Sequence, residues 1–180
     1  MVPQEAGGGD DGPFRRIAIV GFGLIGASIA LAARRRWPSI ELVAIDRQPI
    51  VDAAIRTHAA DSGGEAIGLV RGAELIVLAA PVLANVRILS ELPAHLAGRA
   101  IVTDVGSTKR QIAAAAAALP PPLTFIGGHP LAGAALGGLD QARADLFADR
   151  PWILAPPTTN TADAADRLGR FVKGWARTST

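Results

Sequence analysis

The chain has 180 residues, of which 49% are hydrophobic and 19% are charged, a composition typical of a folded globular protein rather than a disordered one. Its formal net charge is only +2, and its arginines are spread along the chain with few aromatic residues, which argues against nucleic-acid binding. It contains 0 Cys and three scattered His, so a disulfide scaffold and a cysteine nucleophile are excluded, no metal site is expected, and a reducing compartment fits.

The first residues and the apolar stretch after them bear on targeting. Residues 1–13 are polar and glycine-rich, and we expect a flexible leader, followed by one NAD(P)-binding domain over residues 14–180. Residues 17–33 carry no charge and resemble a membrane span, but they are fewer than the ~20 that a bilayer requires. Three glycines would also weaken a helix there by about 1 kcal/mol each. We therefore predict a strand, a glycine turn and a buried helix, no membrane partner, and a cytoplasmic protein.

Along the chain, short β-branched runs alternate with longer stretches rich in Ala and Leu, the pattern of a parallel sheet covered by helices. Most of the short runs are continuously apolar, as expected for strands buried on both faces. Strands are predicted at 16–20, 41–45, 75–79, 100–104, 124–126 and 152–154, and helices at 24–36, 49–59, 82–92, 109–118, 136–147 and 162–176. The predicted fold class is α/β, a doubly wound, mostly parallel sheet of Rossmann type with helices on both faces.

A glycine pattern follows the first predicted strand directly and opens an apolar helix, which is the context of a dinucleotide-binding turn. Gly21 would allow the tight turn, Gly23 would let the backbone approach a pyrophosphate, and Gly26 would let the helix pack closely on the strand. The N-terminus of that helix would offer free N–H groups to the anion. We therefore expect the cofactor to contact Gly21, Phe22, Gly23, Leu24, Ile25 and Gly26.

An acidic residue ends the second predicted strand. Asp46 lies about twenty residues after Gly26, where a carboxylate would accept hydrogen bonds from the adenosine ribose hydroxyls. This favours NAD over NADP, because the carboxylate would repel the extra phosphate, although the neighbouring Arg47 could hold that phosphate. The alternative is that Asp46 merely ends a strand before a helix.

Three later segments, 79–82, 104–109 and 127–133, fall at the carboxyl ends of predicted strands, where open α/β sheets bind their ligands. Ala80, Pro81 and Asp104 join the cofactor-binding candidates on this ground. We expect Asp104 to brace its turn rather than to act as an acid, and Lys109 to lie on the surface of the helix that follows.

The catalytic candidates are His129 and Ser107. His129 lies between glycines and a proline, and we expect it on a tight turn with exposed backbone. A neutral imidazole beside a nicotinamide can accept the proton of an alcohol while the hydride leaves to NAD, because histidine exchanges protons near working pH. Ser107 could orient that alcohol or the imidazole. Alternatively, Ser107 or Thr108 could cap the next helix.

These motifs resemble those of the prephenate dehydrogenases and the closely related arogenate dehydrogenases. The match runs from about Arg15 to the chain end, and its second and third motifs are the most specific. The resemblance implies an enzyme of tyrosine biosynthesis that oxidises and decarboxylates prephenate to 4-hydroxyphenylpyruvate and passes hydride to NAD. It also implies that His129 hydrogen-bonds the ring hydroxyl and helps to remove its proton, supported by Ser107. The matching residues are GFGLIGAS at 21–28, DVGSTK at 104–109, GGHPLAG at 127–133, LF at 146–147 and WIL at 152–154.

Members of this family continue into a mostly helical domain that forms the dimer and supplies an arginine for the substrate carboxylate. The resemblance implies that this domain is absent from the 180 residues, so we expect NAD binding but poor turnover of prephenate. An apolar face near 136–154 would then lie uncovered, and the chain would self-associate or bind a partner through it. The alternatives are an arogenate dehydrogenase, another NAD(P)-dependent dehydrogenase or imine reductase of this architecture, and a dinucleotide-binding module without catalysis.

Overall fold

The computed structural model describes residues 12–134, 136–156 and 161–179, and the strands among them form one eight-stranded sheet. The strand order is β3-β2-β1-β4-β5-β6-β7-β8. All neighbours from β3 to β6 pair in parallel, β7 runs antiparallel to β6, and β8 is parallel to β7. The strands are β1 Arg16–Val20, β2 Glu41–Ile45, β3 Ser62–Gly64, β4 Leu75–Leu78, β5 Ala100–Asp104, β6 Leu123–Pro130, β7 Pro151–Ala155 and β8 Arg177–Ser179.

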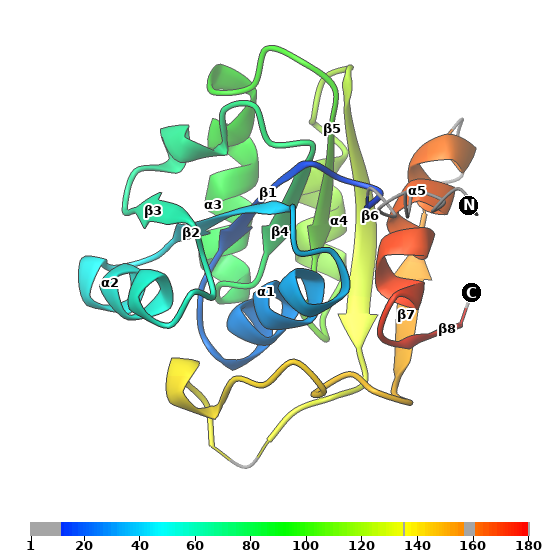
Figure 1. Ribbon diagram of the computed structural model, residues 1–180. Coiled ribbons are helices and arrows are strands. Elements are labelled where there is room, and N and C mark those ends of the chain that lie inside the picture. The colour runs from blue at the N-terminus through cyan, green and yellow to red at the C-terminus, as the bar shows by residue number, and fades with distance from the viewer. Residues whose placement is uncertain (1–11, 135, 157–160, 180) are drawn as a thin grey trace, which may run out of the picture.

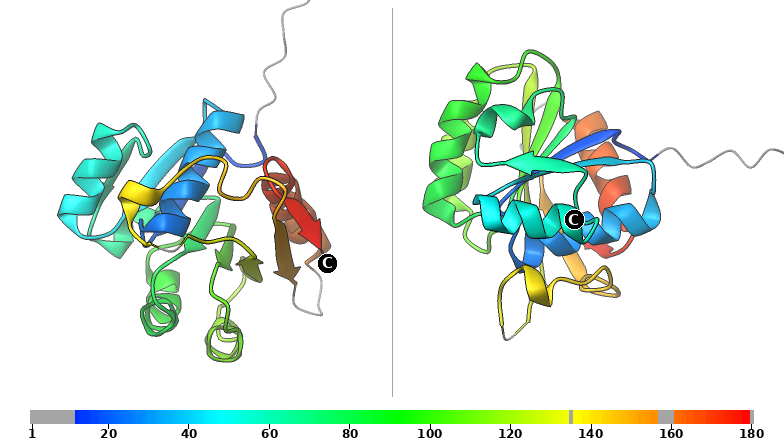
Figure 2. Two further views of the ribbon diagram at one scale, coloured as in Figure 1. Left: turned by 90° about the horizontal axis from the view of Figure 1, so that it is seen from below. Right: turned by 60° about the vertical axis from the view of Figure 1, so that its left-hand side comes forward.

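Helices cover both faces of this sheet, with α1 and α2 on one face and α3 and α4 on the other (Figure 1; Figure 2, left). Buried side chains of α1, α2 and α5 join one apolar cluster, and those of α3 and α4 join a second cluster across the sheet. The α-helices are α1 Leu24–Arg36, α2 Gln48–Arg56, α3 Val82–Glu91, α4 Arg110–Ala116 and α5 Ala162–Lys173; the 3₁₀ helices are η1 Ile67–Val70, η2 Leu92–Ala94 and η3 Leu139–Gln141. The predicted α/β class and the doubly wound arrangement are confirmed.

The apolar stretch 17–33 is a strand, a turn and a helix, as predicted, because β1 and α1 flank the glycine turn. Strands β1, β2 and β5 and helix α1 have the predicted bounds. The sequence pattern missed β3 and β8, two three-residue strands. No helix among the described residues is long and apolar enough to cross a membrane.

The helix predicted at 136–147 is wrong. The described part of this segment holds only the short η3. Two consecutive glycines, Gly137 and Gly138, precede η3, and Gly138 has φ +104°, outside the helical region. The segment crosses below α1 in Figure 1, where the backbone N–H of Arg143 donates to the buried Ser28 Oγ at 3.1 Å. Leu146 and Phe147 enter the core beside Trp152. Packing against α1 and the core therefore determines the conformation of this segment. Its apolar residues are buried without forming one face of a helix.

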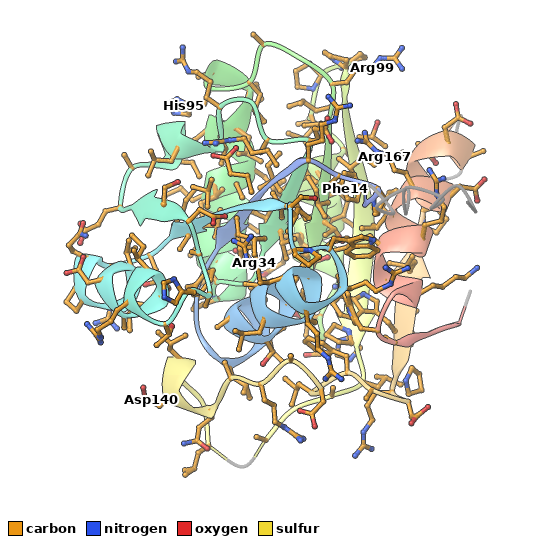
Figure 3. The ribbon with its side chains drawn as sticks, in the orientation of Figure 1. Phe14, Arg34, His95, Arg99, Asp140 and Arg167 are labelled. Atoms are coloured by element: carbon orange, nitrogen blue, oxygen red, sulfur yellow. The ribbon has the colours of Figure 1, made fainter. Side chains whose placement is uncertain are left out.

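The end of the predicted leader is held against α5. Residues 1–11 lie outside the described part of the chain, but the Pro13 carbonyl accepts a hydrogen bond from Arg167 Nε at 2.7 Å. The Arg167 guanidinium lies over the Phe14 ring at 4.4 Å and pairs with Glu74 (Figure 3). Phe14 also packs edge-on against Phe171 of α5. Phe14 is the first buried residue in the described part of the chain.

The apolar face predicted near 136–154 is only partly exposed. Leu146, Phe147, Trp152 and Leu154 are buried. Two large side chains of this region, Leu136 and Ile153, remain 67% and 40% exposed, together with Leu131 just before it. The pleat of β7 explains the difference, because Trp152 and Leu154 point into the core and Ile153 points to the opposite face.

Candidate cofactor-binding site

The parallel strands end level with one another, and this alignment brings the candidate segments together. Cross-strand register places Ile45, Val20, Leu78, Asp104 and Gly127 in one row across β2, β1, β4, β5 and β6. The glycine turn, the β4–α3 turn and the loop 105–109 all follow this row, as does the end of β6. The strand order also reverses direction between β1 and β4, which is the point where open α/β sheets bind ligands.

The glycine turn is packed so tightly that two of its glycines cannot be replaced without movement. Gly21 has φ +89°, and a Cβ there would lie 2.4 Å from the Ala80 nitrogen. A Cβ on Gly26 would lie 2.1 Å from the Gly21 carbonyl oxygen. A Cβ on Gly23 would meet no heavy atom within 4 Å, so the chain leaves open the position where the backbone should meet a pyrophosphate.

Helix α1 begins directly behind this open position. Its N-cap is Gly23, which provides no side-chain hydrogen bond, and the first helical turn contains no acidic residue. The first intrahelical bond runs from the Ala27 N–H to the Gly23 carbonyl, so the preceding N–H groups lack helical acceptors. The uncapped end carries about half a positive charge from the aligned peptide dipoles. The residues present therefore fit a bound dinucleotide diphosphate.

Asp46 lies beside the glycine turn rather than at an isolated strand end. Its Oδ2 accepts the backbone N–H of Phe22 at 2.7 Å, and its Oδ1 accepts that of Arg47 at 2.7 Å. A carboxylate has about four acceptor positions, so two remain for hydroxyl groups of a ligand. Phe22 itself is buried and anchors the turn to the core.

The turn between β4 and α3 contains Ala80 and Pro81, and it is held by a residue that the sequence analysis missed. Asn85 is 1% exposed, and its Nδ2 donates to the Ala80 carbonyl at 2.8 Å. The Asn85 N–H donates to the Pro81 carbonyl in the first turn of α3, so the backbone and the side chain of Asn85 both hold the β4–α3 turn. This turn packs against Gly21 of the glycine turn. An amide among the apolar residues of α3 was the available signal.

Asp104 joins the two segments that carry Ser107 and His129. Its carboxylate is buried, and Oδ2 accepts the Lys109 Nζ at 2.5 Å and the Gly106 N–H at 3.1 Å. Its Oδ1 accepts the Gly128 N–H at 3.3 Å. The expectation that Lys109 merely lies on the helix surface is wrong, because its ammonium group also donates to the Gly106 carbonyl. The ion pair closes the loop 105–109 against β6.

His129 lies within β6, so the predicted tight turn is wrong. It faces Ile153 across the antiparallel β6–β7 pair. A glycine is needed at position 128, because a Cβ there would lie 2.6 Å from the Asp104 carbonyl oxygen and would prevent the close packing of β5 and β6. The His129 side chain is half-buried, and its Nδ1 is buried without a hydrogen-bond partner in the described part of the chain.

Ser107 and Thr108 are exposed on the loop after β5, and neither caps α4. The N-cap of α4 is Lys109, without a side-chain capping bond, so the capping alternative is wrong for both hydroxyls. The loop follows Asp104, the last residue of β5, which is level with Gly127, two residues before His129 on β6. Register therefore places the Ser107 loop and His129 at the same edge of the sheet.

A groove of about 1120 Å³ opens next to this site, between α4, β6, β7 and the start of α5. It touches the site only through Lys109 and Gly127 and does not include the glycine turn. One of its lining residues, Arg99, lies at the end of the molecule opposite to Asp140 of η3 (Figure 3). Among the residues described, no group of three or more acidic or histidine side chains is arranged to hold a metal ion.

The strand order, the tight glycine turn, the uncapped α1 and the adjacent carboxylate define a Rossmann-type dinucleotide-binding domain. Within that class, the chain belongs to the family described as "Prephenate dehydrogenase, nucleotide-binding domain", whose profile matches residues 29–178. It is 34% identical over 165 residues to the prephenate dehydrogenase of Bacillus subtilis (strain 168), a match that covers 88% of this chain.

Two solved structures are similar to the chain over nearly its whole length. Arogenate dehydrogenase from Synechocystis is 35% identical, with a TM-score of 0.82 over 91% of this chain. Prephenate dehydrogenase from Aquifex aeolicus, in complex with hydroxyphenyl propionate and NAD+, is 25% identical, with a TM-score of 0.85 over 92% of it. The chain spans 44% of the Bacillus relative and 58% and 59% of these two structures, respectively.

Proposed function

We propose that this chain is the NAD-binding part of a dehydrogenase that oxidises and decarboxylates prephenate. The observation that carries the proposal is the single row of strand ends from which the glycine turn, the Ser107 loop and His129 all continue. Family membership over residues 29–178 supports the reaction, and the NAD+ complex of the Aquifex relative supports the cofactor. The proposal places the protein in the cytoplasm, with a small-molecule substrate.

The chain's own residues have separate tasks in binding. The N-terminus of α1 stabilises the pyrophosphate charge at the open Gly23 position, and Asp46 accepts hydrogen bonds from ribose hydroxyls. The β4–α3 turn, which Asn85 fixes, lies between the glycine turn after β1 and the loop after β5, because β4 is the strand between β1 and β5. When bound, NAD supplies the hydride acceptor.

His129 receives the proton of the substrate ring hydroxyl, and Ser107 orients that hydroxyl. The carbon that bears the hydroxyl loses hydride to the bound NAD, and the bond to the ring carboxylate breaks, so that carbon dioxide leaves and its bonding electrons make the ring aromatic. The proton held by His129 then returns to the phenolate oxygen of the product. Aromatisation drives the reaction, and the protein has mainly to position its partners and to accept and return one proton. The Asp104–Lys109 pair supports this role, because it holds both the Ser107 loop and the strand that carries His129.

Arogenate is the second candidate substrate, because a solved arogenate dehydrogenase is 35% identical to the chain. Arogenate has the same cyclohexadienol ring as prephenate, so His129 and Ser107 would have the same tasks. The two substrates differ in the side chain, where arogenate carries an amine in place of a ketone.

The test is a calorimetric titration of the chain with NAD, and then with prephenate or arogenate. NADH formation is assayed in a longer version that carries the second domain of the family, because the chain spans 58% and 59% of the two solved dehydrogenases. In that version we expect His129→Asn to reduce NADH formation at least about a hundredfold, since general-base catalysis contributes about 10²–10⁴-fold. NAD affinity should stay within about twofold of the unmodified chain. An equal loss of NAD affinity would contradict the proton-acceptor role, and no binding of NAD by the unmodified chain would overturn the proposal.

A further inference from the structure

A second carboxylate lies near Asp46, at the start of α2, and it comes from a different strand. Glu65 directly follows β3, and its Oε1 accepts the backbone N–H of Gln48 at 2.8 Å. Gln48 is the first residue of α2. Glu65 reaches this place only through the pairing of β3 with β2, so the sequence pattern pointed to Asp46 and Arg47 alone.

The turn that leads into α2 has no backbone N–H left for another anion. The N-cap residue Arg47 contributes no side-chain capping bond, and Pro49 has no N–H. Every other N–H of residues 46–51 already has an acceptor. The donors and acceptors are Asp46 N–H to the Gly64 carbonyl at 3.2 Å, Arg47 N–H to Asp46 Oδ1 at 2.7 Å, Gln48 N–H to Glu65 Oε1 at 2.8 Å, and Ile50 and Val51 N–H to the Arg47 carbonyl at 2.9 and 3.2 Å.

The occupied helix start bears on whether NAD or NADP can bind next to Asp46. The extra phosphate of NADP is attached to the ribose hydroxyl that such an acidic residue binds in NAD. A helix N-terminus would stabilise that phosphate, and the exposed Arg47 could add a cation. Glu65 removes this possibility in two ways, because it takes the Gln48 N–H and places a second negative charge there.

We infer that Glu65 is a specificity-determining residue that acts with Asp46 to exclude the 2′-phosphate of NADP. The inference rests on the proposed function, since it requires NAD to bind in the orientation set by the glycine turn and Asp46. It predicts that changing Asp46 alone leaves NADP binding weak, because the Gln48 N–H is still occupied and Glu65 still carries its charge.

The experiment is calorimetric titration of the 180-residue chain with NAD+ and with NADP+ at one ionic strength. Glu65→Ala removes the charge and releases the Gln48 N–H, and we expect NADP+ affinity to rise about tenfold while NAD+ affinity stays within about twofold. Glu65→Gln removes the charge but keeps an acceptor oxygen, and we expect a rise of about threefold.

The matched control is Asp52→Asn. Asp52 is an exposed carboxylate on the same helix that accepts the Gln48 side-chain Nε2 at 2.7 Å, so this variant changes net charge equally without releasing a backbone donor. We expect both affinities to stay within about twofold. Thermal melting shows whether each variant is folded, and Glu65→Gln decides the matter if Glu65→Ala does not fold.

Failure of the Glu65 inference and failure of the proposed function give different experimental results. Retained NAD+ binding with an unchanged NADP+ to NAD+ ratio in the folded Glu65 variants would overturn the inference alone, as would an equal shift in Asp52→Asn. Absence of NAD+ binding by the unmodified chain would overturn the proposed function, and the inference with it.

Discussion

Asp104→Asn tests whether one buried carboxylate holds the Ser107 loop against β6. Asp104 is 1% exposed and accepts hydrogen bonds from Lys109 Nζ, Gly106 N–H and Gly128 N–H. The asparagine has nearly the same shape but replaces one acceptor oxygen by an NH₂ group. At least one of these donors then faces another donor, and Lys109 loses its counter-ion.

The expected loss of stability in Asp104→Asn follows from these contacts. A hydrogen bond to a charged group contributes about 1.5–3 kcal/mol, and an unpaired buried donor costs about 1–3 kcal/mol. The Lys109 side chain is 31% exposed, so water compensates for part of its loss. We therefore expect Asp104→Asn to reduce the free energy of unfolding by about 2–4 kcal/mol, or the melting temperature by roughly 5–15 °C for a chain of this size.

Urea unfolding measures this loss, and hydrogen exchange of the Gly128 amide shows whether it is local. Glu91→Gln is the control, because the Arg87–Glu91 pair is exposed and 3.7 Å apart; it should cost at most about 0.5 kcal/mol. Lys109→Met and the double variant complete a cycle whose coupling energy should be about 1–3 kcal/mol. Additive effects within about 0.5 kcal/mol, or unchanged Gly128 exchange in Asp104→Asn, would refute the reasoning.

Two further predictions concern the glycine turn and the segment below α1. Gly26→Ala should lower stability by about 1–3 kcal/mol and weaken NAD binding at least about tenfold, because its Cβ would lie 2.1 Å from the Gly21 carbonyl oxygen. The control is Gly169→Ala in α5, where a Cβ would meet no heavy atom within 4 Å; it should be neutral or stabilising by up to ~1 kcal/mol. Unchanged NAD affinity of Gly26→Ala in calorimetry would contradict the assignment of this turn to NAD binding. Ser28→Ala should reduce the free energy of unfolding by about 1 kcal/mol and speed tryptic cleavage after Arg143, because it removes the acceptor of the Arg143 N–H. Ser90→Ala, at an exposed serine, should do neither. Equal cleavage rates in the two variants would show that Ser28 does not hold the segment 136–147.

Local sequence patterns were enough to predict the strands, the helix and the glycine turn at the nucleotide-binding end of the sheet. The buried strands β1, β2 and β5 are continuous apolar runs, and α1 begins where the glycines end. Gly21 and Gly26 are recognisable because their steric requirement arises within a few residues of the turn itself. These features depend on neighbours in the chain, so the α/β class and the position of the cofactor turn could be predicted.

Contacts between distant segments determined the rest. Glu65 meets Gln48 only because β3 pairs with β2, and the carboxylate of Asp104 reaches the Gly128 N–H across a strand pair. His129 is in a strand rather than a turn because β7 pairs with it, and 136–147 is irregular because it packs on α1 and the core. The sequence by itself therefore determined the class of fold and the cofactor turn. The tertiary structure decided which charges and hydrogen bonds surround them, because those depend on residues far apart in the chain.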